Sequence, residues 1–394
     1  MKKLLIATAA SALMAGAASA EEVKIGILIG FTGPIESLTS DMAAGAELAM
    51  KEVSDPGKLL GGDTVTAVRG DSTCIDSAAA TSAAERLITS EGVMGIVGAD
   101  CSGVTGAVLQ NVARPNGIVM ISPSATSPAL TTAEDDGLFF RTSPSDAREG
   151  EVMADILTEK GIKSIALTYT NNDYGKGLAD AIQSSFEARG GKVTINASHE
   201  DGKADYSAEV AALASAGGDL LVVAGYLDQG GKGIIQSSLD SGAFDTFGLP
   251  GGMVGDNLPL AIGPALDGSY GQVAQSDSSG AATMIKIGEA NGFNAQTPYT
   301  MESYDAAALI MLAMQAAGST KSADYKSKVL EVANAPGEKI YPGELAKALD
   351  LLAAGTDIDY EGASAVELIG PGESSGRYRE FVVKDGKYET VKFR

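Results

Sequence analysis

The stretch VKIGILIGFTGPIESLTSDMAAGAELAMKEV, residues 23–53, decides the fold of this chain of 394 residues. Its first part, residues 23–31, is a short and largely apolar run, which is typical of a strand that is buried on both faces. The turn residues Thr32-Gly33-Pro34 follow, and residues 40–53 then form a helix-like run. A strand that leads directly into a helix is the building unit of a parallel α/β sheet.

The same alternation of strand-like and helix-like runs continues along the chain and begins again near residue 144. In the first half the strand-like runs are residues 64–71, 94–98 and 117–122, and the helix-like runs are residues 77–90 and 103–112. In the second half the strand-like runs are residues 164–169, 192–197 and 220–225, and the helix-like runs are residues 146–160, 175–189 and 206–216. This pattern predicts an α/β fold with two doubly wound, Rossmann-like lobes.

Helix-like runs alone follow the strand-like run at residues 266–274, and we expect these helices to pack on the first lobe. Near the C-terminus, Asp385-Gly386 lies between two strand-like runs and predicts a β-hairpin. We therefore expect residues 21–143 and 275–362 to form lobe 1. Residues 144–274 and 363–394 would form lobe 2, and a hinge of three segments, near residues 142–145, 273–275 and 363–368, would join the lobes.

The N-terminus has the parts of a secretory signal peptide. Lys2 and Lys3 precede a short apolar run, which ends at Ala18-Ser19-Ala20. We expect cleavage after residue 20 and export of a soluble chain, and no cysteine lies at the cleavage site to carry a lipid anchor.

Composition excludes several classes of function. The chain has 51 acidic and 29 basic residues and a net charge of −22, which argues against nucleic acid or an anionic membrane as a partner. His199 is the only histidine and lies in a polar, loop-like stretch, residues 198–203. A Ser-His-Asp triad would have to be built around this one loop residue, which argues against it, and a site with several histidine ligands for a metal is excluded. We assign no catalytic residue, metal or cofactor, and a hydrolase that uses two carboxyl groups is the enzymatic alternative.

Cys74 and Cys101 are the only cysteines, and each follows a strand-like run of the first half. An even pair in an exported chain indicates a disulfide, and neighbouring parallel strands would bring the two residues within bridging distance. The alternative is a pair of buried, unpaired thiols.

Loops that follow the strands are the expected ligand site, because ligands bind at the carboxyl ends of the strands in open α/β sheets. In the first lobe these loops contain small hydroxyl residues, notably Ser102 and Thr126. Such residues at a helix N-terminus suit a carboxylate, although the hydroxyls could instead only cap the helices. In the second lobe the loops contain Tyr174 and Tyr226, which could line the site or only pack at the strand ends.

At these residues the chain resembles the leucine/isoleucine/valine-binding proteins, which are type I periplasmic binding proteins of ATP-binding-cassette importers. The resemblance covers nearly the whole mature chain. The residues that carry it are the segment from Ile25 to Gly33-Pro34, Asp71-Ser72-Thr73-Cys74, Cys101-Ser102 with Thr105, the segment MISPSATSP at residues 120–128, Asp173-Tyr174-Gly175-Lys176-Gly177 and Gly225-Tyr226.

The resemblance implies a periplasmic, monomeric receptor whose two lobes close on an amino acid in the manner of a Venus flytrap and deliver it to a membrane permease. Ser102, Thr126 and the backbone of Ser124 and Ala125 would hold the ligand carboxylate. Tyr174 and Tyr226 would close over the ligand, and Tyr299 would touch its side chain. The resemblance also implies the Cys74–Cys101 disulfide.

The chain departs from the family at Gly251, where amino acid binders place an acidic residue for the ligand ammonium. A buried ammonium needs an anionic partner, and the candidates are Asp228 and Asp100. We favour Asp228, which could instead cap the helix that starts near Gly230. If neither acts, the ligand is an aromatic or aliphatic carboxylate, or an amide, for uptake or for sensing. Leu38 also replaces a tryptophan that often lines the family's pocket.

Overall fold

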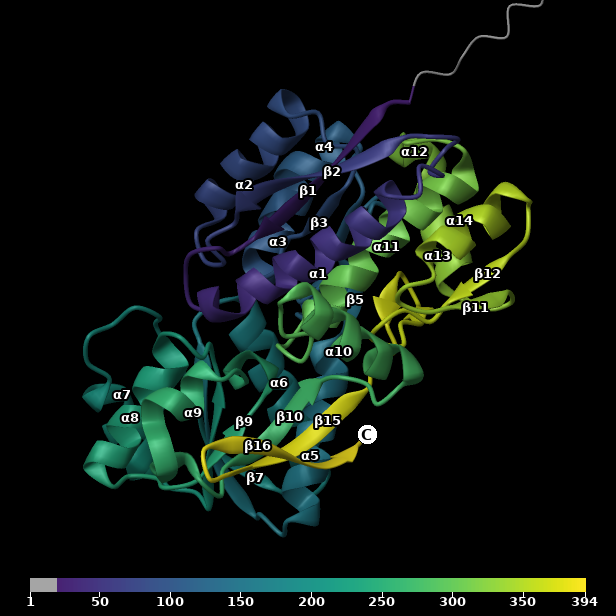
Figure 1. The fold of residues 1–394 in the computed structure, drawn as a ribbon. Coiled ribbons are helices and arrows are strands. Elements are labelled where there is room, and N and C mark those ends of the chain that lie inside the picture. The colour runs from purple at the N-terminus through teal and green to yellow at the C-terminus, as the bar shows by residue number, and fades with distance from the viewer. Residues whose placement is uncertain (1–19) are drawn as a thin grey trace, which may run out of the picture.

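Two seven-stranded sheets, each covered by helices, organise the computed structural model, which describes residues 20–394 (Figure 1). The arrangement confirms the expected fold class of two α/β lobes. The predicted signal peptide falls almost entirely on residues 1–19, which lie outside the described part. Among residues 20–394, no helix has both the length and the apolar character that crossing a membrane requires.

The first sheet has the strand order β13-β14-β5-β4-β3-β1-β2. β1 lies in its interior and pairs in parallel with both β2 and β3, and its residues Ile25, Ile27 and Leu28 are fully buried. This explains its largely apolar sequence. The strands are β1 Glu22–Ile29, β2 Thr64–Asp71, β3 Ile96–Gly98, β4 Met120–Ser122, β5 Phe139–Pro144, β13 Leu368–Ile369 and β14 Glu373–Ser374.

The second sheet has the order β16-β15-β10-β9-β8-β6-β7. β15 and β16 form an antiparallel hairpin around Asp385-Gly386, as predicted, and β15 pairs with β10. The strands are β6 Ser164–Thr170, β7 Lys192–His199, β8 Leu220–Ala224, β9 Phe247–Leu249, β10 Tyr270–Ala274, β15 Tyr378–Lys384 and β16 Lys387–Phe393.

Helices cover both sheets, and α11 is the most deeply buried of those that pack on the first one. Residues Thr300 to Met314 of α11 are all buried, because this helix lies between α1, α13 and the strands of the first sheet. The helices of this lobe are α1 Glu36–Ser54, α2 Ser77–Glu85, α3 Ser102–Val108, α4 Arg114–Asn116, α11 Thr300–Ala317, α12 Ser322–Tyr325, α13 Lys328–Ala333 and α14 Leu345–Ala353. The remaining helices are α5 Asp146–Glu159, α6 Asp173–Ala188, α7 Ser207–Ala216, α8 Gly230–Ser241, α9 Asn257–Ile262 and α10 Ser279–Asn291.

The strand pairing differs from the expected division near the C-terminus. Residues 363–394 were all expected in lobe 2, but β14 pairs with β5 in the first sheet, and β13 pairs with β14. The chain therefore leaves the first sheet after Ser374 and enters the second at Tyr378. A short parallel pair, β11 Glu338–Ile340 and β12 Ile358–Tyr360, also occurs where only helices were expected, because such short strands leave little periodicity in the sequence.

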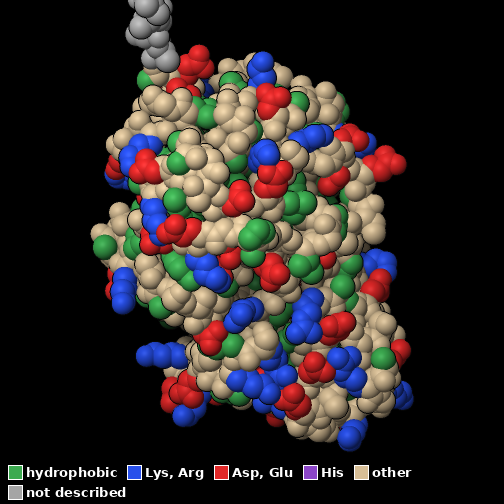
Figure 2. Space-filling model, turned by 90° about the vertical axis from the view of Figure 1, so that its right-hand side faces the viewer, with side chains coloured by type: hydrophobic (Ala, Val, Ile, Leu, Met, Phe, Trp, Pro, Cys, Tyr) green, Lys and Arg blue, Asp and Glu red, His purple; other side chains and the backbone are tan. Residues whose placement is uncertain are grey.

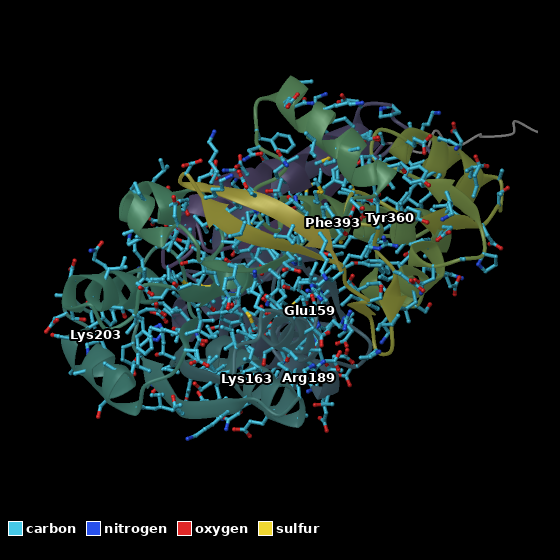
Figure 3. All side chains as sticks on the ribbon, turned by 90° about the horizontal axis from the view of Figure 1, so that it is seen from below. Glu159, Lys163, Arg189, Lys203, Tyr360 and Phe393 are labelled. Atoms are coloured by element: carbon cyan, nitrogen blue, oxygen red, sulfur yellow. A yellow bond between two sulfur atoms is a disulfide. The ribbon has the colours of Figure 1, made fainter. Side chains whose placement is uncertain are left out.

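The C-terminal hairpin is tied to α5 by ion pairs. The Arg394 guanidinium lies 2.7 Å from the Glu159 carboxylate and the Lys392 ammonium lies 2.9 Å from it. Figure 3 labels Glu159 on α5 and Phe393 at the end of β16. These two cations lower the pKa of Glu159 to about 2.

On the face shown in Figure 2, side chains of both charges are interspersed and no broad hydrophobic patch appears.

Candidate functional site

A small cavity lies between the lobes, beside the loops that follow the strands. Its volume is about 20 Å³, which is room for about one water molecule. The side chains around it come from both lobes, so the lobes are closed over it. The lining residues are Ile35, Leu38, Asp100, Cys101, Ser102, Ser124, Tyr174, Tyr226, Gly252 and Tyr299.

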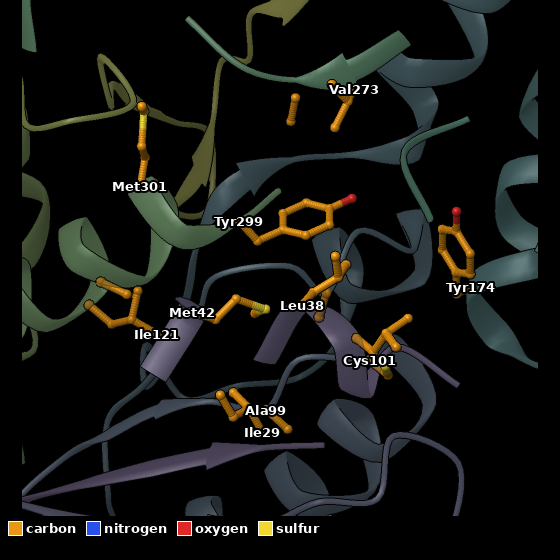
Figure 4. Packing of buried hydrophobic residues seen from close by; sticks show 14 of the residues in the cluster. Ile29, Leu38, Met42, Ala99, Cys101, Ile121, Tyr174, Val273, Tyr299 and Met301 are labelled. Atoms are coloured by element: carbon orange, nitrogen blue, oxygen red, sulfur yellow. The ribbon is translucent and has the colours of Figure 1, made fainter. Parts of the chain in front are cut away.

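The structure thus brings together six of the side chains that were singled out in the sequence: Asp100, Ser102, Ser124, Tyr174, Tyr226 and Tyr299. Three others, Ala125, Thr126 and Asp228, do not line the cavity. Leu38 lines it, and Figure 4 shows Leu38 between Tyr299 and Cys101, with Tyr174 across from them.

Ser102 and the loop after β4 form the first-lobe wall. The Ser102 hydroxyl oxygen accepts hydrogen bonds from the backbone N–H groups of Thr126 and Ser127, at 3.1 and 3.0 Å. It does not cap its own helix, since Cys101 is the N-cap of α3. Both acceptor positions of the Ser102 oxygen are used, so its O–H hydrogen remains available to donate.

Thr126 also does not cap a helix; the capping residue is its neighbour Ser127. Ser127 caps the short helix Pro128–Thr132 by accepting from the Ala129 N–H. The Thr126 hydroxyl is buried and has no hydrogen-bond partner within residues 20–394. Its hydrogen-bonding capacity is therefore unused in this closed arrangement.

A buried arginine that the sequence analysis missed shapes the same loop. The Arg141 guanidinium, on β5, donates to the carbonyl oxygens of Ala125 and Ser127 at 3.1 and 2.9 Å and pairs with Glu373 of β14 at 2.5 Å. Arg141 is 1% exposed. Because a planar guanidinium can bind several oxygens at once, this side chain holds the loop against the first sheet.

Asp100 lines the cavity, but its carboxylate is already occupied. One oxygen accepts from the Gly30 N–H at 2.7 Å and the other accepts from the Ser72 hydroxyl at 2.6 Å. Burial raises the pKa of this carboxyl group, and these hydrogen bonds act in the opposite direction. Asp100 thus holds the ends of β1 and β2 together, and it has little capacity left for a ligand.

The predicted disulfide is confirmed, although the strands that carry its cysteines are not neighbours. Cys74 and Cys101 are bonded, with Cα atoms 5.1 Å apart. They follow β2 and β3, which flank β1 on opposite sides, so the bond passes over the end of β1. Gly30 lies there, and a β-carbon at this position would lie 3.2 Å from that of Cys74. Because Gly30 has no side chain, the disulfide can lie close to the backbone at the end of β1.

Two stacked tyrosines form the second-lobe wall. The rings of Tyr174 and Tyr226 have centroids 5.1 Å apart and an interplanar angle of 18°. The Tyr174 hydroxyl accepts a hydrogen bond from the Gly252 N–H at 3.1 Å. Burial raises the pKa of both tyrosines well above the usual value, so both keep neutral hydroxyl groups.

Gly251 lies against a buried glutamate that the sequence analysis missed. The Gly251 N–H donates to Glu149 Oε1 at 2.7 Å, and Gln272 Nε2 donates to the same oxygen at 3.3 Å. A β-carbon at position 251 would lie 2.9 Å from the Tyr299 hydroxyl oxygen and 3.4 Å from Glu149 Oε1. Burial, more than any other cause, raises the pKa of Glu149 to about 7.

Asp146 is a second buried acid, one turn before Glu149 on α5. It is fully buried, and within the described residues neither of its carboxylate oxygens has a hydrogen-bond partner. Burial raises its pKa well above the usual range, and the negative charge of Glu149 raises it further. Acidic residues in the first turn of a helix are common surface features, which is why sequence alone did not single these out.

Asp228, the favoured partner for a ligand ammonium, is placed elsewhere. Its Oδ2 atom accepts from the Ser37 N–H at 3.0 Å and its Oδ1 atom accepts from Asn257 Nδ2 at 3.0 Å. The alternative role, capping the helix near Gly230, is filled instead by Asp201, which accepts from the Gly230 N–H at 3.0 Å. Asp228 therefore binds the first turn of α1 in the opposite lobe.

His199 is the last residue of β7 and is 1% exposed. The sequence analysis placed it in a polar loop, but the strand extends further than expected. Its Nδ1 atom lies 2.9 Å from the Thr168 hydroxyl, and burial lowers its pKa to about 4. Within residues 20–394, no three His, Cys, Asp or Glu side chains are grouped as metal ligands.

Comparisons with known proteins agree with this geometry. A family model described as a periplasmic binding protein matches residues 22–337. The Leu/Ile/Val-binding protein homolog 1 of Brucella melitensis is 33% identical over 326 residues, which cover 81% of this chain and 85% of that protein.

Solved structures share the fold at low sequence identity. The substrate-binding protein of the branched-chain amino acid transporter of Streptococcus pneumoniae, in complex with isoleucine, has a TM-score of 0.76 at 21% identity and covers 94% of this chain and 99% of its own. An ABC-transporter solute-binding protein of R. palustris, in complex with benzoate, has a TM-score of 0.74 at 22% identity and covers 94% of this chain and 96% of its own. One of these ligands carries an ammonium group and the other does not.

Proposed function

This chain belongs to the periplasmic binding protein family, and from that premise we propose that it is the substrate-binding component of an ATP-binding-cassette importer. It binds a small solute with a carboxylate group, a branched-chain or other aliphatic amino acid, between its lobes. It then delivers the solute to a permease in the inner membrane. It acts as an exported, periplasmic monomer and catalyses no reaction.

The observation that carries this proposal is the hydrogen-bonding capacity left on the first-lobe wall. The Ser102 hydroxyl lines the cavity, and its oxygen accepts two backbone N–H groups and keeps its own hydrogen to donate. This hydroxyl suits an oxygen of a carboxylate. Across the cavity, the stacked rings of Tyr174 and Tyr226 cover the ligand with apolar surface.

Ligand entry requires the lobes to separate, because a cavity of about 20 Å³ is far smaller than an amino acid. We propose that residues 21–143 and 275–374 move as one lobe and that residues 144–274 and 375–394 move as the other. Three crossings then form the hinge, after β5, after β10 and after β14. Hinged closure around a ligand is a common motion of two-lobed proteins.

A thermal-shift screen of amino acids, aromatic acids, amides and urea tests the proposal. A ligand at a hundred times its dissociation constant stabilises the protein by about 2.7 kcal/mol. Ser102→Ala should weaken binding of the ligand that emerges by about tenfold or more. Ser278→Ala, which removes the N-cap of α10 outside the cavity lining, is the matched control and should leave affinity unchanged. Stabilisation by amides or urea alone would contradict a carboxylate ligand.

A further inference from the structure

We propose that Glu149 supplies the negative charge that Gly251 lacks, and that the ligand accordingly carries a positively charged group, as an α-amino acid does. The inference rests on the proposed function and deepens it, because it names the residue that would bind the ammonium group of the proposed amino acid ligand. Aromatic and aliphatic acids without an ammonium group would gain nothing from this residue.

The first argument is position. The Glu149 carboxylate hydrogen-bonds the Gly251 N–H at 2.7 Å, and its two oxygens lie 3.4 and 3.7 Å from the point where a side chain at position 251 would begin. The charge thus reaches the same place from α5 rather than from the loop after β9. A side chain at position 251 would itself approach the Tyr299 hydroxyl to 2.9 Å, so this geometry favours glycine there.

The second argument is the unused capacity beside Glu149. Asp146 is fully buried, and neither of its carboxylate oxygens makes a well-aligned hydrogen bond within residues 20–394, although the nearby Thr126 hydroxyl lowers its pKa. Buried polar groups normally have partners, so this carboxylate keeps capacity for a donor from outside the chain. An ammonium group carries three donors, which suits a pair of carboxyl groups.

The third argument is closeness to the cavity. A β-carbon at position 251 would lie 2.9 Å from the Tyr299 hydroxyl oxygen and 3.4 Å from Glu149 Oε1, and Tyr299 lines the cavity. Neither acid lines the cavity while the lobes are closed, but Glu149 binds the backbone of Gly251, whose neighbour Gly252 does line it. The negative charges of both acids also raise the pKa of Tyr174 and Tyr299, after burial.

The surroundings do not neutralise the pair. The titratable and charged groups around it are Arg148 on α5, Arg141 on β5, Tyr174 on α6, Tyr299 before α11, Tyr226 after β8 and Tyr378 on β15. Arg141 is engaged by Glu373 and by loop carbonyl groups, and Arg148 by Glu151. Without a ligand, burial of two neighbouring acids favours holding a proton on the pair. A ligand ammonium would take the place of that proton.

Matched ligand pairs test the inference, each an amino acid and the same acid without its ammonium group. Suitable pairs are L-leucine with 4-methylpentanoate and L-phenylalanine with 3-phenylpropanoate. Glu149→Gln keeps an oxygen that can accept from the Gly251 N–H but removes the charge. It should weaken binding of the amino acid by at least about 30-fold and change binding of the ammonium-free acid by less than about threefold. Glu380→Gln removes the charge of another buried acid, which pairs with Arg394, and it is the control that should change neither.

Calorimetry also measures the number of protons released on binding, which would not change if Glu149 had only a structural role. At pH 7, in buffers of different ionisation enthalpy, the wild type should release about half a proton or more for each amino acid bound, and Glu149→Gln should release fewer. Unaltered amino acid affinity in Glu149→Gln, or wild-type binding of the ammonium-free acids alone, would overturn the inference while leaving carboxylate binding in place. Binding of neither member of any pair would instead contradict the proposed function, and the inference with it.

Discussion

Asp228 of the second lobe binds the backbone of Ser37 in the first lobe, with 3.0 Å between Oδ2 and the nitrogen. The Asp228 N–H in turn donates to the Pro34 carbonyl oxygen at 3.1 Å. Ser37 lies in the first turn of α1, where backbone N–H groups have no partner within the helix. The side chain of one lobe thus caps a helix of the other, and only while the lobes are closed.

Asp228→Ala should therefore weaken ligand binding through the closed state rather than through the ligand itself. Loss of one partly exposed hydrogen bond to a charged group corresponds to about 1 kcal/mol, or roughly fivefold in affinity. Asp256→Ala removes the same charge from an exposed position nearby and should have almost no effect. Titration calorimetry measures both. If Asp228→Ala instead lowered the affinity for amino acids a hundredfold and left the affinity for ammonium-free acids unchanged, Asp228 would be the partner of the ammonium group.

Gly252→Ala should disrupt the second-lobe wall. The added β-carbon would lie 2.5 Å from the Tyr174 hydroxyl oxygen and 2.6 Å from the Gly225 carbonyl oxygen. Crowding of this kind costs about 1 to 3 kcal/mol, and we expect a lower melting temperature together with at least tenfold weaker ligand binding. Gly106→Ala in α3 is the control, since a β-carbon there meets no atom within 4 Å. Equal behaviour of the two variants would show that the approach of Gly252 to Tyr174 does not matter.

Replacing both cysteines by serine should destabilise the first lobe. The Cys74–Cys101 bond closes a loop of 27 residues, and loss of such a cross-link costs about 3 to 4 kcal/mol in the chain-entropy model. Chemical denaturation of the wild type and of the double variant measures the difference. The denatured, unreduced wild type should show no reactive thiol. Two reactive thiols in that titration would contradict the disulfide.

The free energy of unfolding should decrease at acidic pH, partly because of His199. Burial lowers its pKa to about 4 from a usual value near 6.5, so between these values the unfolded chain binds a proton that the folded chain does not. The resulting stability is present above pH 6.5 and is lost as the pH falls towards 4, by about 3 kcal/mol in total. His199→Gln should remove this part of the pH dependence. The free energy of unfolding at pH 7.5, 5 and 4 tests it, and parallel pH profiles for the two proteins would refute the assignment.

Local sequence was enough to predict the individual elements and the class of fold. β2 was predicted at residues 64–71 and occupies Thr64–Asp71, and the hairpin at Asp385-Gly386 forms as expected. Buried parallel strands and amphipathic helices leave these patterns because burial follows the period of each element. The clustering of Ser102, Ser124, Tyr174 and Tyr226 also followed from one rule, that loops at the carboxyl ends of parallel strands meet.

Only the tertiary structure decided which charges lie beside Gly251 and the cavity. Glu149 and Gly251 are 102 residues apart in sequence, and their contact depends on how α5 packs beneath the loop after β9. Asp228, two residues after a cavity tyrosine, turns instead to the opposite lobe. The period of a strand or helix predicts which face of that element is buried, but not which element will cover it. The partner of a buried charge is set by packing between distant segments, and sequence spacing carries no record of that packing.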